Sequence, residues 1–435
     1  MRKQKINIVT LGCSKNVVDS EYLMNQLSVG GWEVVHDSND PSAKVVVINT
    51  CGFIGDAKEE SIDTILRFCQ AKEEGIIDRV YVMGCLSQRY KNELESEIPN
   101  VDGYYGVTDL VDIASELNVS YRPELENRRL ITTPEHYAYL KISEGCNWGC
   151  SYCAIPGIRG KHQSRKFEDI VDEAKSLAAQ GVKELLVIAQ DTTYYGFDLY
   201  GERRIAELLA ELEKIDGIEW IRLHYAYPTN FPNDLLTVMA NSSKICHYID
   251  IPFQHISNNV LTKMRRGISK EETLELIDNM RKSVPNIAIR TTLLVGHPGE
   301  TEQDFKELVE FVKAVKFDRL GVFTYSEEEG TYAANNFPDE ISEEVKQQRM
   351  EEIMTIQSAI SEEKNLARVG KTFRVIVDRQ EGEYWVGRTE FDSPEVDQEV
   401  LFVATNSHSV GIGSFVDVTI NRAEEYDMFG VLGVF

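Results

Sequence analysis

Three cysteines within eight residues carry the clearest chemical signal in this 435-residue sequence. Cys146, Cys150 and Cys153, here called the loop cysteines, follow the pattern Cys-x-x-x-Cys-x-x-Cys on a glycine-containing loop after the strand-like run 137–142. A loop of this length can present three thiolates to one iron–sulfur cluster and leave one iron open for another ligand. Structural zinc is the main alternative, but it takes four ligands, and the next candidate, His162, lies nine residues beyond the last cysteine.

A second set of three cysteines follows three separate strand-like runs. Each run is short, apolar and rich in β-branched residues, as buried parallel strands are; the runs are 6–11, 45–48 and 80–83, and Cys13, Cys51 and Cys85, here called the strand-end cysteines, come directly after them. A single cysteine of this kind is more often a buried apolar thiol. The carboxyl ends of parallel strands form a binding crevice, so the repeated context favours a second three-thiolate cluster. Cys69 and Cys246 lack this context, and we expect them to serve as packing residues.

Strand-like and helix-like segments then alternate over about two hundred residues. Strands are expected at 137–143, 184–189, 220–224, 247–251, 287–294 and 320–323. Repeated βα units predict a parallel, barrel-like sheet with its chemistry at the carboxyl ends of the strands. Six units are too few to close an eight-stranded barrel, so we expect a partial, open (βα)6 barrel that could admit a macromolecular substrate.

Polar segments follow several of these strands. Residues 189–193 follow the second strand and residues 295–300 the fifth, where Gly296 permits close backbone approach to a ligand. His255 follows the fourth strand. It could contact a ligand or substrate, or it could be a hydrogen-bonded structural histidine, and the sequence favours neither. Arg265 and Arg266 could hold a carboxylate, although a solvated surface position is the default expectation for such a pair.

The C-terminal part indicates a long helix followed by a small antiparallel β-barrel. Ser342 is a suitable N-cap for a helix that ends near residue 370. Short runs with turns between them follow at 372–377, 384–388, 399–403 and 414–420, as in a small barrel. The chain is therefore assigned to the α/β class, with an N-terminal parallel-sheet α/β domain, a central partial barrel and a C-terminal β-barrel.

Charge limits the partners that this chain could bind. The formal net charge is −25, and residues 371–435 hold five basic and twelve acidic residues. Nucleic-acid grooves need cations, so the acidic barrel argues against RNA and favours a basic protein. No run of about 18 apolar residues would span a membrane. The start of the chain leads into a strand without a signal-peptide pattern, so we expect a cytoplasmic protein with reduced thiols.

The loop cysteines, with the aromatic Tyr152 before the last of them, resemble the radical S-adenosylmethionine (SAM) signature. The longer string through 154–160 resembles the methylthiotransferase branch of that superfamily. The resemblance implies that the loop cysteines hold a 4Fe-4S cluster whose open iron chelates SAM. One electron would then cleave the sulfonium to release a 5′-deoxyadenosyl radical that abstracts a hydrogen atom. SAM contacts are implied at Tyr152, Gln190, Asp191, Gly296 and His297.

The same resemblance extends to both ends of the chain. Segments 11–16, 49–53 and 84–86 are similar to the family's N-terminal domain, in which the matching cysteines, here Cys13, Cys51 and Cys85, hold an auxiliary 4Fe-4S cluster thought to deliver sulfur. The C-terminal barrel resembles the TRAM domain. The implied domains are residues 1–120 (N-terminal methylthiotransferase domain), 132–363 (radical SAM core) and 366–435 (TRAM domain), with a linker at 121–135.

Local strings favour one branch of this family. Segments 15–21, 190–196, 248–252 and 322–331 resemble the branch that modifies a ribosomal protein more than the tRNA-modifying branch. That branch implies replacement of a β-carbon hydrogen of one aspartate in small-subunit ribosomal protein twelve by a methylthio group. Two SAM molecules and an external one-electron reductant would be required. The alternatives are a tRNA adenosine methylthiotransferase and a non-catalytic iron–sulfur or zinc protein.

Overall fold

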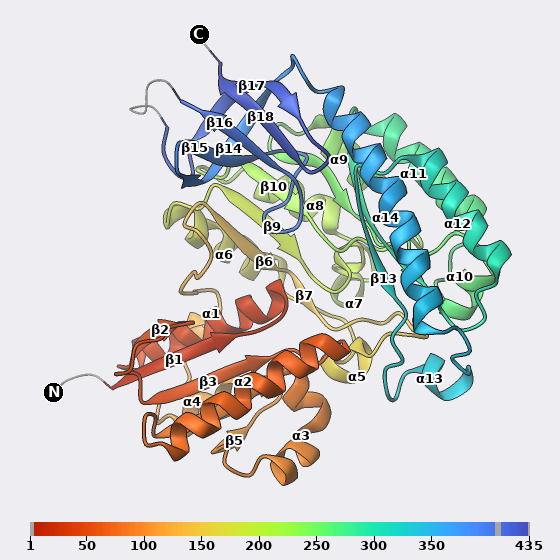
Figure 1. Cartoon of the computed structure of the whole chain (residues 1–435). Coiled ribbons are helices and arrows are strands. Elements are labelled where there is room, and N and C mark those ends of the chain that lie inside the picture. Colours follow the sequence, from red (N-terminus) through yellow and green to blue (C-terminus); the bar gives the residue numbers. More distant parts are fainter. Residues whose placement is uncertain (1–3, 405–409, 434–435) are drawn as a thin grey trace. The chain divides into compact units, whose positions relative to one another are not determined.

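The computed structural model describes residues 4–404 and 410–433, and the chain divides into two compact units (Figure 1). The first unit contains Met1–Thr133, Tyr139–Asn147 and Ala154–Ser176. The second contains Pro134–Ala138, Trp148–Cys153 and Leu177–Phe435. The loop that carries the loop cysteines is therefore shared between the two units.

The first unit is built on a five-stranded parallel sheet with the order β2-β1-β3-β4-β5. Its central strands match the three predicted runs: β1 (Lys5–Thr10), β3 (Val45–Thr50) and β4 (Arg79–Gly84). The edge strands are β2 (Glu33–His36) and β5 (Gly103–Tyr104). Every residue of β3 is buried, which explains its continuous apolar run, since helices cover both faces of a parallel sheet.

Four helices cover this sheet. They are α1 (Ser14–Val29), α2 (Gly55–Glu73), α3 (Cys85–Glu97) and α4 (Leu110–Glu116). α1 and α4 pack on one face and α2 and α3 on the other, in two separate hydrophobic clusters. Cys69 lies buried in the second cluster, as a packing residue would. Smaller elements of the unit are η1 (Pro123–Leu125), α5 (Ile155–Arg159) and the two-stranded ribbon β7 (Ser143–Glu144) with β8 (Gln163–Ser164).

Five strands of an open six-stranded sheet, with the order β13-β12-β11-β10-β9-β6, lie in the second unit, and β6 runs from the second unit into the first. The strands are β6 (Tyr137–Lys141), β9 (Glu184–Ile188), β10 (Trp220–Leu223), β11 (Ile245–Asp250), β12 (Ala288–Val295) and β13 (Arg319–Thr324). All six predicted strands are present, and the expectation of a partial barrel is confirmed. Cys246 is buried in β11 within an apolar cluster.

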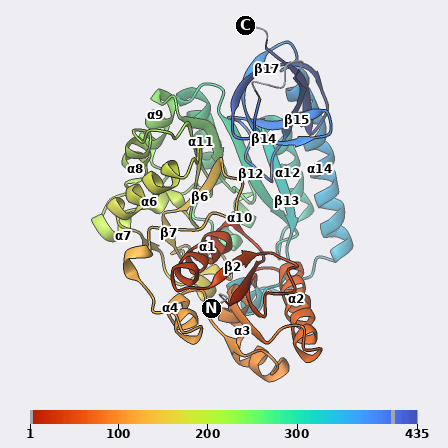
Figure 2. The same ribbon diagram turned by 90° about the vertical axis from the view of Figure 1, so that its left-hand side faces the viewer.

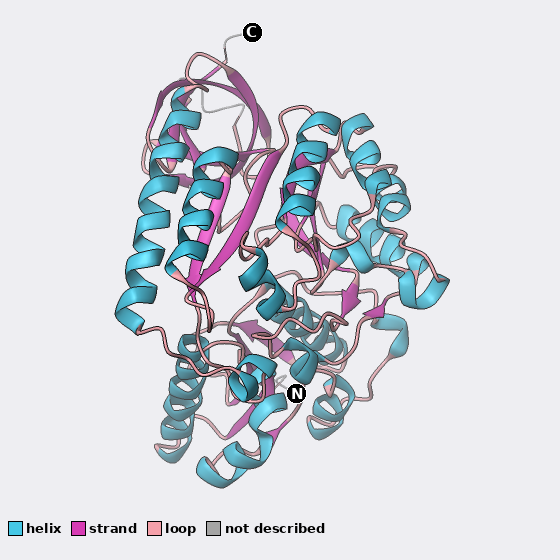
Figure 3. Ribbon diagram, turned by 90° about the vertical axis from the view of Figure 1, so that its right-hand side faces the viewer, coloured by secondary structure: helices cyan, strands magenta, loops and turns pink. Residues whose placement is uncertain are grey.

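Helices of the second unit lie alongside its strands (Figure 3). They are α7 (Phe197–Tyr200), α8 (Ile205–Leu212), α9 (Asn233–Asn241), α10 (Asn258–Met264), α11 (Lys270–Ser283), α12 (Glu302–Val315) and α13 (Tyr332–Asn336), with the short η2 (Thr192–Tyr194); α6 (Phe167–Ala179) runs from the first unit into the second. α12 shows how such a helix begins and ends. A capping box of Thr301 and Asp304 starts it, and Lys316 ends it in the left-handed conformation.

The C-terminal part of the second unit is a helix followed by a closed five-stranded barrel. α14 (Glu343–Leu366) begins after Ser342, whose hydroxyl accepts a hydrogen bond from the Val345 N–H. The barrel strands are β14 (Thr372–Glu381), β15 (Tyr384–Thr389), β16 (Glu399–Val403), β17 (Phe415–Ala423) and β18 (Asp427–Leu432), in the order β14-β15-β16-β18-β17. Figure 2 shows β14, β15 and β17 next to α14.

The barrel differs from the expectation in two respects. The sequence pattern did not reveal β18, which closes the barrel between β16 and β17. The pairing of β16 with β18 is parallel, whereas the other four strand pairings described for the barrel are antiparallel. In the part of the chain that the structure describes, no helix is long and apolar enough to cross a membrane.

Candidate functional sites

The strand-end cysteines lie at the carboxyl edge of three neighbouring strands. Cys13 comes between β1 and α1, Cys51 directly follows β3, and Cys85 begins α3 after β4. Since β1, β3 and β4 are adjacent and parallel in the sheet, their carboxyl ends meet at one edge. The structure therefore brings together three thiols that are far apart in the sequence.

Glycines allow these strand ends to approach one another. A Cβ atom at Gly12, whose φ is +89°, would lie 2.7 Å from the Cβ atom of Cys51. A Cβ atom at Gly52 would lie 2.6 Å from the Cα atom of Leu86, next to Cys85. Contacts this short are not tolerated between real atoms, so only glycine fits at both positions.

Asn16, in the first turn of α1, joins all three strand ends. Its Nδ2 donates to the carbonyl oxygens of Leu11 at 2.8 Å and Thr50 at 3.1 Å. Its Oδ1 lies 3.8 Å from the Cys85 Sγ, within the range of a weak thiol hydrogen bond. The side chain is fully buried, so it fixes the relative positions of the segments that carry the thiols.

The electrostatics of this edge favour uncharged thiols until a cation is bound. Burial, together with the neighbouring thiolates of Cys13 and Cys51, raises the pKa of Cys85 to about 12. Burial likewise raises the pKa of Cys51. A metal centre binds thiolates, so its binding must release the thiol protons and therefore depends on pH. The charge of a nearby arginine, Arg159, acts in the opposite direction on both groups.

The arrangement suits an iron–sulfur cluster better than a single ion. All eight cysteines are free thiols. Among residues 4–404 and 410–433, no three His, Cys, Asp or Glu side chains converge closely enough to hold one metal ion, as structural zinc requires. In a multi-iron cluster each thiolate binds a different iron, so the sulfurs need not meet at one point.

The loop cysteines are divided between the two units. In the first unit, the Cys146 N–H donates to the Gly160 carbonyl at 3.1 Å. In the second unit, the Cys153 N–H donates to the Cys150 carbonyl at 3.1 Å, which forms a tight turn. All three are partly exposed, and each unit presents its own cysteines on this loop.

Cys150 lies in a group of aromatic and cationic side chains. Its Sγ is 3.4 Å from the Tyr227 hydroxyl and 3.4 Å from Nη1 of Arg266. The guanidinium of Arg266 lies 4.2 Å from the centre of the Tyr227 ring, and Trp148 stacks on the same ring at 4.1 Å. Arg266 is only 4% exposed, so the expectation of a solvated surface residue is wrong for it.

Asp191, at the carboxyl end of β9, is engaged with protein groups. It accepts a hydrogen bond from the Trp148 indole N–H at 2.6 Å. Its other oxygen accepts from the N–H of Thr193 at 2.8 Å and from the hydroxyl of the same residue, which caps η2. Gln190 is half-buried in the preceding position. The carboxylate of Asp191 therefore positions Trp148 beside the loop cysteines of this unit.

His297, after β12, packs next to the cysteine loop. It is fully buried, hydrogen bonds to the Ser151 hydroxyl at 3.1 Å, and meets the Tyr152 ring edge to face at 6.3 Å. Burial lowers the pKa of His297 to about 4, so the imidazole is neutral at pH 7. At Gly296, with φ +76°, a Cβ atom would lie 2.4 Å from the Lys346 Cγ, so packing against α14 explains this glycine.

His255 has a structural role in this arrangement. It is fully buried, and its Nδ1 accepts a hydrogen bond from the Ser257 N–H at 3.0 Å. Burial lowers the pKa of His255 to about 3. One ring nitrogen thus has a structural role, and the other, Nε2, has no hydrogen-bond partner among the residues that the structure describes.

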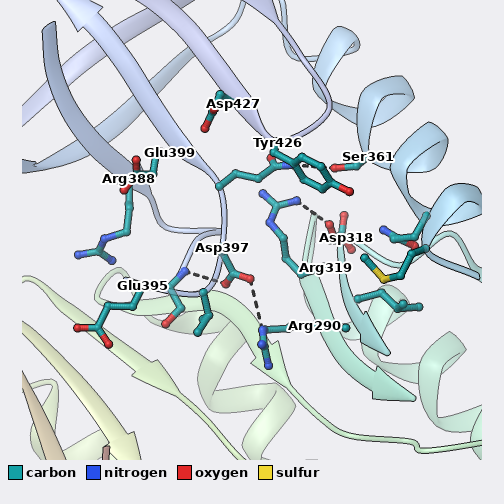
Figure 4. Close-up of a pocket in the computed structure, with 17 residues that line it drawn as sticks. Arg290, Asp318, Arg319, Ser361, Arg388, Glu395, Asp397, Glu399, Tyr426 and Asp427 are labelled. Carbon is teal, nitrogen blue, oxygen red and sulfur yellow. Dashed lines mark hydrogen bonds and ion pairs between the residues drawn. The ribbon is translucent and has the colours of Figure 1, made fainter. Parts of the chain in front are cut away.

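A cavity of about 450 Å³ lies at the opposite end of the strands in the second unit. Its lining includes Arg290 near the start of β12, Arg319 at the start of β13, and the barrel residue Asp397. Figure 4 shows Asp397 directed toward Arg290, and the two form an ion pair at 3.4 Å. This cavity contains none of the predicted site residues, and its charged groups join the barrel to the sheet.

Three family descriptions match successive parts of the chain. Residues 5–106 match Uncharacterized protein family UPF0004, residues 140–312 match the Radical SAM superfamily, and residues 369–432 match the TRAM domain. Ribosomal protein uS12 methylthiotransferase RimO of Phocaeicola vulgatus is 56% identical over 99% of this chain and 99% of its own length. RimO of Bacteroides thetaiotaomicron is 54% identical over 99% of this chain and 98% of its own.

Solved structures share the fold at low sequence identity. The radical SAM methyltransferase TsrM from Kitasatospora setae gives a TM-score of 0.57 at 16% identity and covers 76% of this chain and 77% of its own. The cobalamin-dependent radical SAM enzyme OxsB gives a TM-score of 0.52 at 13% identity, over 81% of this chain and 56% of its own. These likenesses concern the fold alone.

Proposed function

Since the chain belongs to the RimO family of radical SAM methylthiotransferases, we propose that it replaces a β-carbon hydrogen of one aspartate in ribosomal protein uS12 by a methylthio group. The observation that carries this proposal is 56% identity to a RimO protein over 99% of both chains. A match of that extent includes both cysteine sets and the barrel. The non-catalytic alternative has no comparable support.

Each set of cysteines is proposed to hold one 4Fe-4S cluster, the loop cysteines for SAM and the strand-end cysteines as the auxiliary centre. When bound, these groups would supply the electron, the radical and the sulfur, and the protein would orient and shield them. The convergence of β1, β3 and β4 supports the auxiliary site. Its glycines and the buried Asn16 hold the three strand ends at fixed spacing.

Residues of the second unit would hold Cys150, Cys153 and SAM in place. Arg266 directs a buried positive charge at the Cys150 sulfur from 3.4 Å. Tyr227, between Arg266 and Trp148, excludes water from one side of that sulfur. We propose SAM contacts at Tyr152, Gln190 and the 296–297 segment. The two ring nitrogens of His297 are bonded to the Ser151 hydroxyl and the Pro298 carbonyl, so its ring would hold this segment in place.

Asp191 contributes to the same site through Trp148. Its carboxylate holds the indole N–H, and the indole in turn stacks on Tyr227. We therefore propose that Asp191 positions the aromatic stack and does not depend on SAM for its own hydrogen bonds. Substitution by asparagine would retain the shape and weaken the hydrogen bond to the indole.

The charge of the barrel supports a basic protein as partner over tRNA. Four of its five cations have carboxylate partners: Arg374 pairs with Glu219, Arg379 with Glu399, Arg388 with Asp378 and Arg422 with Glu424. The fifth cation, Lys371, forms no ion pair with any of the residues that the structure describes. Phosphate groups would therefore meet few available cations, whereas a lysine- and arginine-rich protein would meet carboxylates.

The proposal also covers the division of the chain into domains, the source of electrons and the location of the protein. The chain would act in three parts, 1–120, 132–363 and 366–435, and would take electrons one at a time from an external reductant. A ribosomal protein substrate implies a cytoplasmic location. Neither a flavin nor a nicotinamide motif in the sequence offers an internal electron source.

The test is a single-turnover assay with the anaerobically reconstituted protein, SAM, a chemical one-electron reductant and purified uS12. Mass spectrometry of peptides should locate a methylthio increment on one aspartate. Unmodified tRNA incubated in parallel should remain unchanged. A methylthio group on tRNA adenosine with unmodified uS12 would instead assign the chain to the tRNA reaction.

A further inference from the structure

Arg159 is a buried cation at the edge that carries the strand-end cysteines. It is the last residue of α5, in the first unit, and 6% of it is exposed. Its Nη2 donates to the Asn16 Oδ1 at 2.6 Å, the same oxygen that lies 3.8 Å from the Cys85 Sγ. Its guanidinium thus reaches the group that joins the three strand ends.

The charge of Arg159 acts on all three strand-end thiols. Its partner Asn16 lies beside the Cys85 sulfur and bonds the strand ends that precede Cys13 and Cys51. The carboxylates of Asp19 and Glu144 hold the guanidinium in its charged form. A single planar guanidinium therefore lies close enough to act electrostatically on every sulfur of the set.

The surrounding ion pairs balance one another without the thiols. Arg159 contacts the carboxylates of Asp19 at 3.2 Å and Glu144 at 2.9 Å. Lys141 forms ion pairs with the same two carboxylates. These four side chains hold two cations and two anions, so their charges balance before any thiolate is added. A buried anionic group is stable only next to a cation.

We propose that Arg159 is the electrostatic partner of the centre held by the strand-end cysteines and raises its reduction potential. The inference rests on the proposed function, because it requires that these cysteines hold a cluster. Reduction adds negative charge, and a fixed cation in a low-dielectric site favours the reduced form. Neighbouring charge and hydrogen bonding are established ways for a protein to tune such a centre. Arg159, the last residue of α5 and six residues after Cys153, would therefore be a positioning residue that acts on the auxiliary site without binding it.

The test compares reduction potentials in a full-length protein whose loop cysteines are replaced by alanine, so that only one cluster is present. Potentials are measured by a dithionite titration followed by electron paramagnetic resonance. Arg159→Gln should shift the reduction equilibrium about tenfold toward the oxidised form, which is ~59 mV for a one-electron couple. Arg159→Lys keeps the charge and should shift it less than half as far.

Two further variants provide a control and an opposite perturbation. Lys141→Gln removes an equally positive group that contacts Asp19 and Glu144, and it should shift the equilibrium less than Arg159→Gln does. Asp19→Asn removes a carboxylate from Arg159 and should shift the equilibrium in the other direction. If Arg159→Gln does not retain iron, the reduction potential of the Asp19→Asn variant still tests the role of Arg159.

The outcomes separate this inference from the function on which it rests. A reference protein that binds no iron would overturn the cluster assignment and the inference together. A reference with about four irons, whose potential is the same in the Arg159→Gln and Asp19→Asn variants, would overturn only the role of Arg159. Equal shifts in Arg159→Gln and Arg159→Lys would also overturn it, because charge would not be the cause.

Discussion

Replacing Glu184 by glutamine should destabilise the second unit more than any exposed ion pair could. Glu184, in β9, lies between two buried guanidinium groups, Arg222 of β10 at 2.8 Å and Arg388 of the barrel strand β15 at 2.8 Å. All three side chains are between 0% and 2% exposed. Glutamine keeps the shape of the side chain but leaves two buried cations without the charge between them.

The magnitude follows from what each arginine retains. Removing one partner of a buried ion pair costs about 3–5 kcal/mol. Arg388 keeps a carboxylate partner, Asp378, at 2.7 Å. Arg222 keeps uncharged partners: peptide oxygens, among them that of Glu390 at 2.6 Å, and the Tyr248 ring at 4.8 Å. The cost therefore arises mainly at Arg222. A unit of this size loses ~2 °C of Tm per kcal/mol, so the expected decrease is ~6–10 °C.

The assay is thermal unfolding at pH 7, with Glu219→Gln as a matched control. Glu219 also pairs with a barrel arginine, Arg374, at 2.8 Å, but both side chains are more than 40% exposed. Such a pair contributes about 0–1 kcal/mol, so the control should lose ~2 °C or less. Equal decreases in the two variants, or an unchanged Tm for Glu184→Gln, would refute the reasoning.

Three further predictions concern the sites. Gly52→Ala should lower the iron content of the strand-end site without loss of helical circular dichroism, because its Cβ would meet the Leu86 backbone; full iron loading would contradict this. Replacing the strand-end cysteines by alanine should preserve SAM cleavage and abolish methylthiolation, as measured by mass spectrometry of both products; loss of cleavage with the other cluster intact would show that the roles are not separate. Burial raises the pKa of Glu300 from 4.5 to about 7, against the charge of Arg349, so its contribution to stability is complete below pH ~4.5 and is lost as pH rises through 7. The wild type should therefore lose stability relative to Glu300→Gln in urea titrations between pH 5 and 8, and parallel curves would count against this shift.

The strands that carry the site were predictable because their signals are local. Continuous β-branched runs predicted β1, β3 and β4, and the cysteine after each run indicated a shared edge of the sheet. The edge strand β5 has two residues, too few for a pattern, and β18 is defined by its parallel pairing with the distant β16. Long-range pairing of this kind leaves no periodicity in the sequence.

The buried cations were not predictable for a different physical reason. Arg159 ends the short helix α5 and Arg266 follows the end of α10, and an arginine in such a position is normally solvated. Each becomes buried because tertiary packing places a carboxylate, a carbonyl or a sulfur next to it. The stack of Trp148 on Tyr227 joins residues 79 positions apart and is likewise invisible to local patterns.

The most direct test of the central claim is mass spectrometry of small-subunit ribosomal proteins and tRNA hydrolysates from cells with and without this gene. The account predicts that deletion removes a methylthio increment from one aspartate of uS12 and leaves tRNA nucleosides unchanged. Loss of a methylthio-adenosine with intact modification of uS12 would contradict the assigned substrate and the charge argument on which the choice between protein and RNA depends.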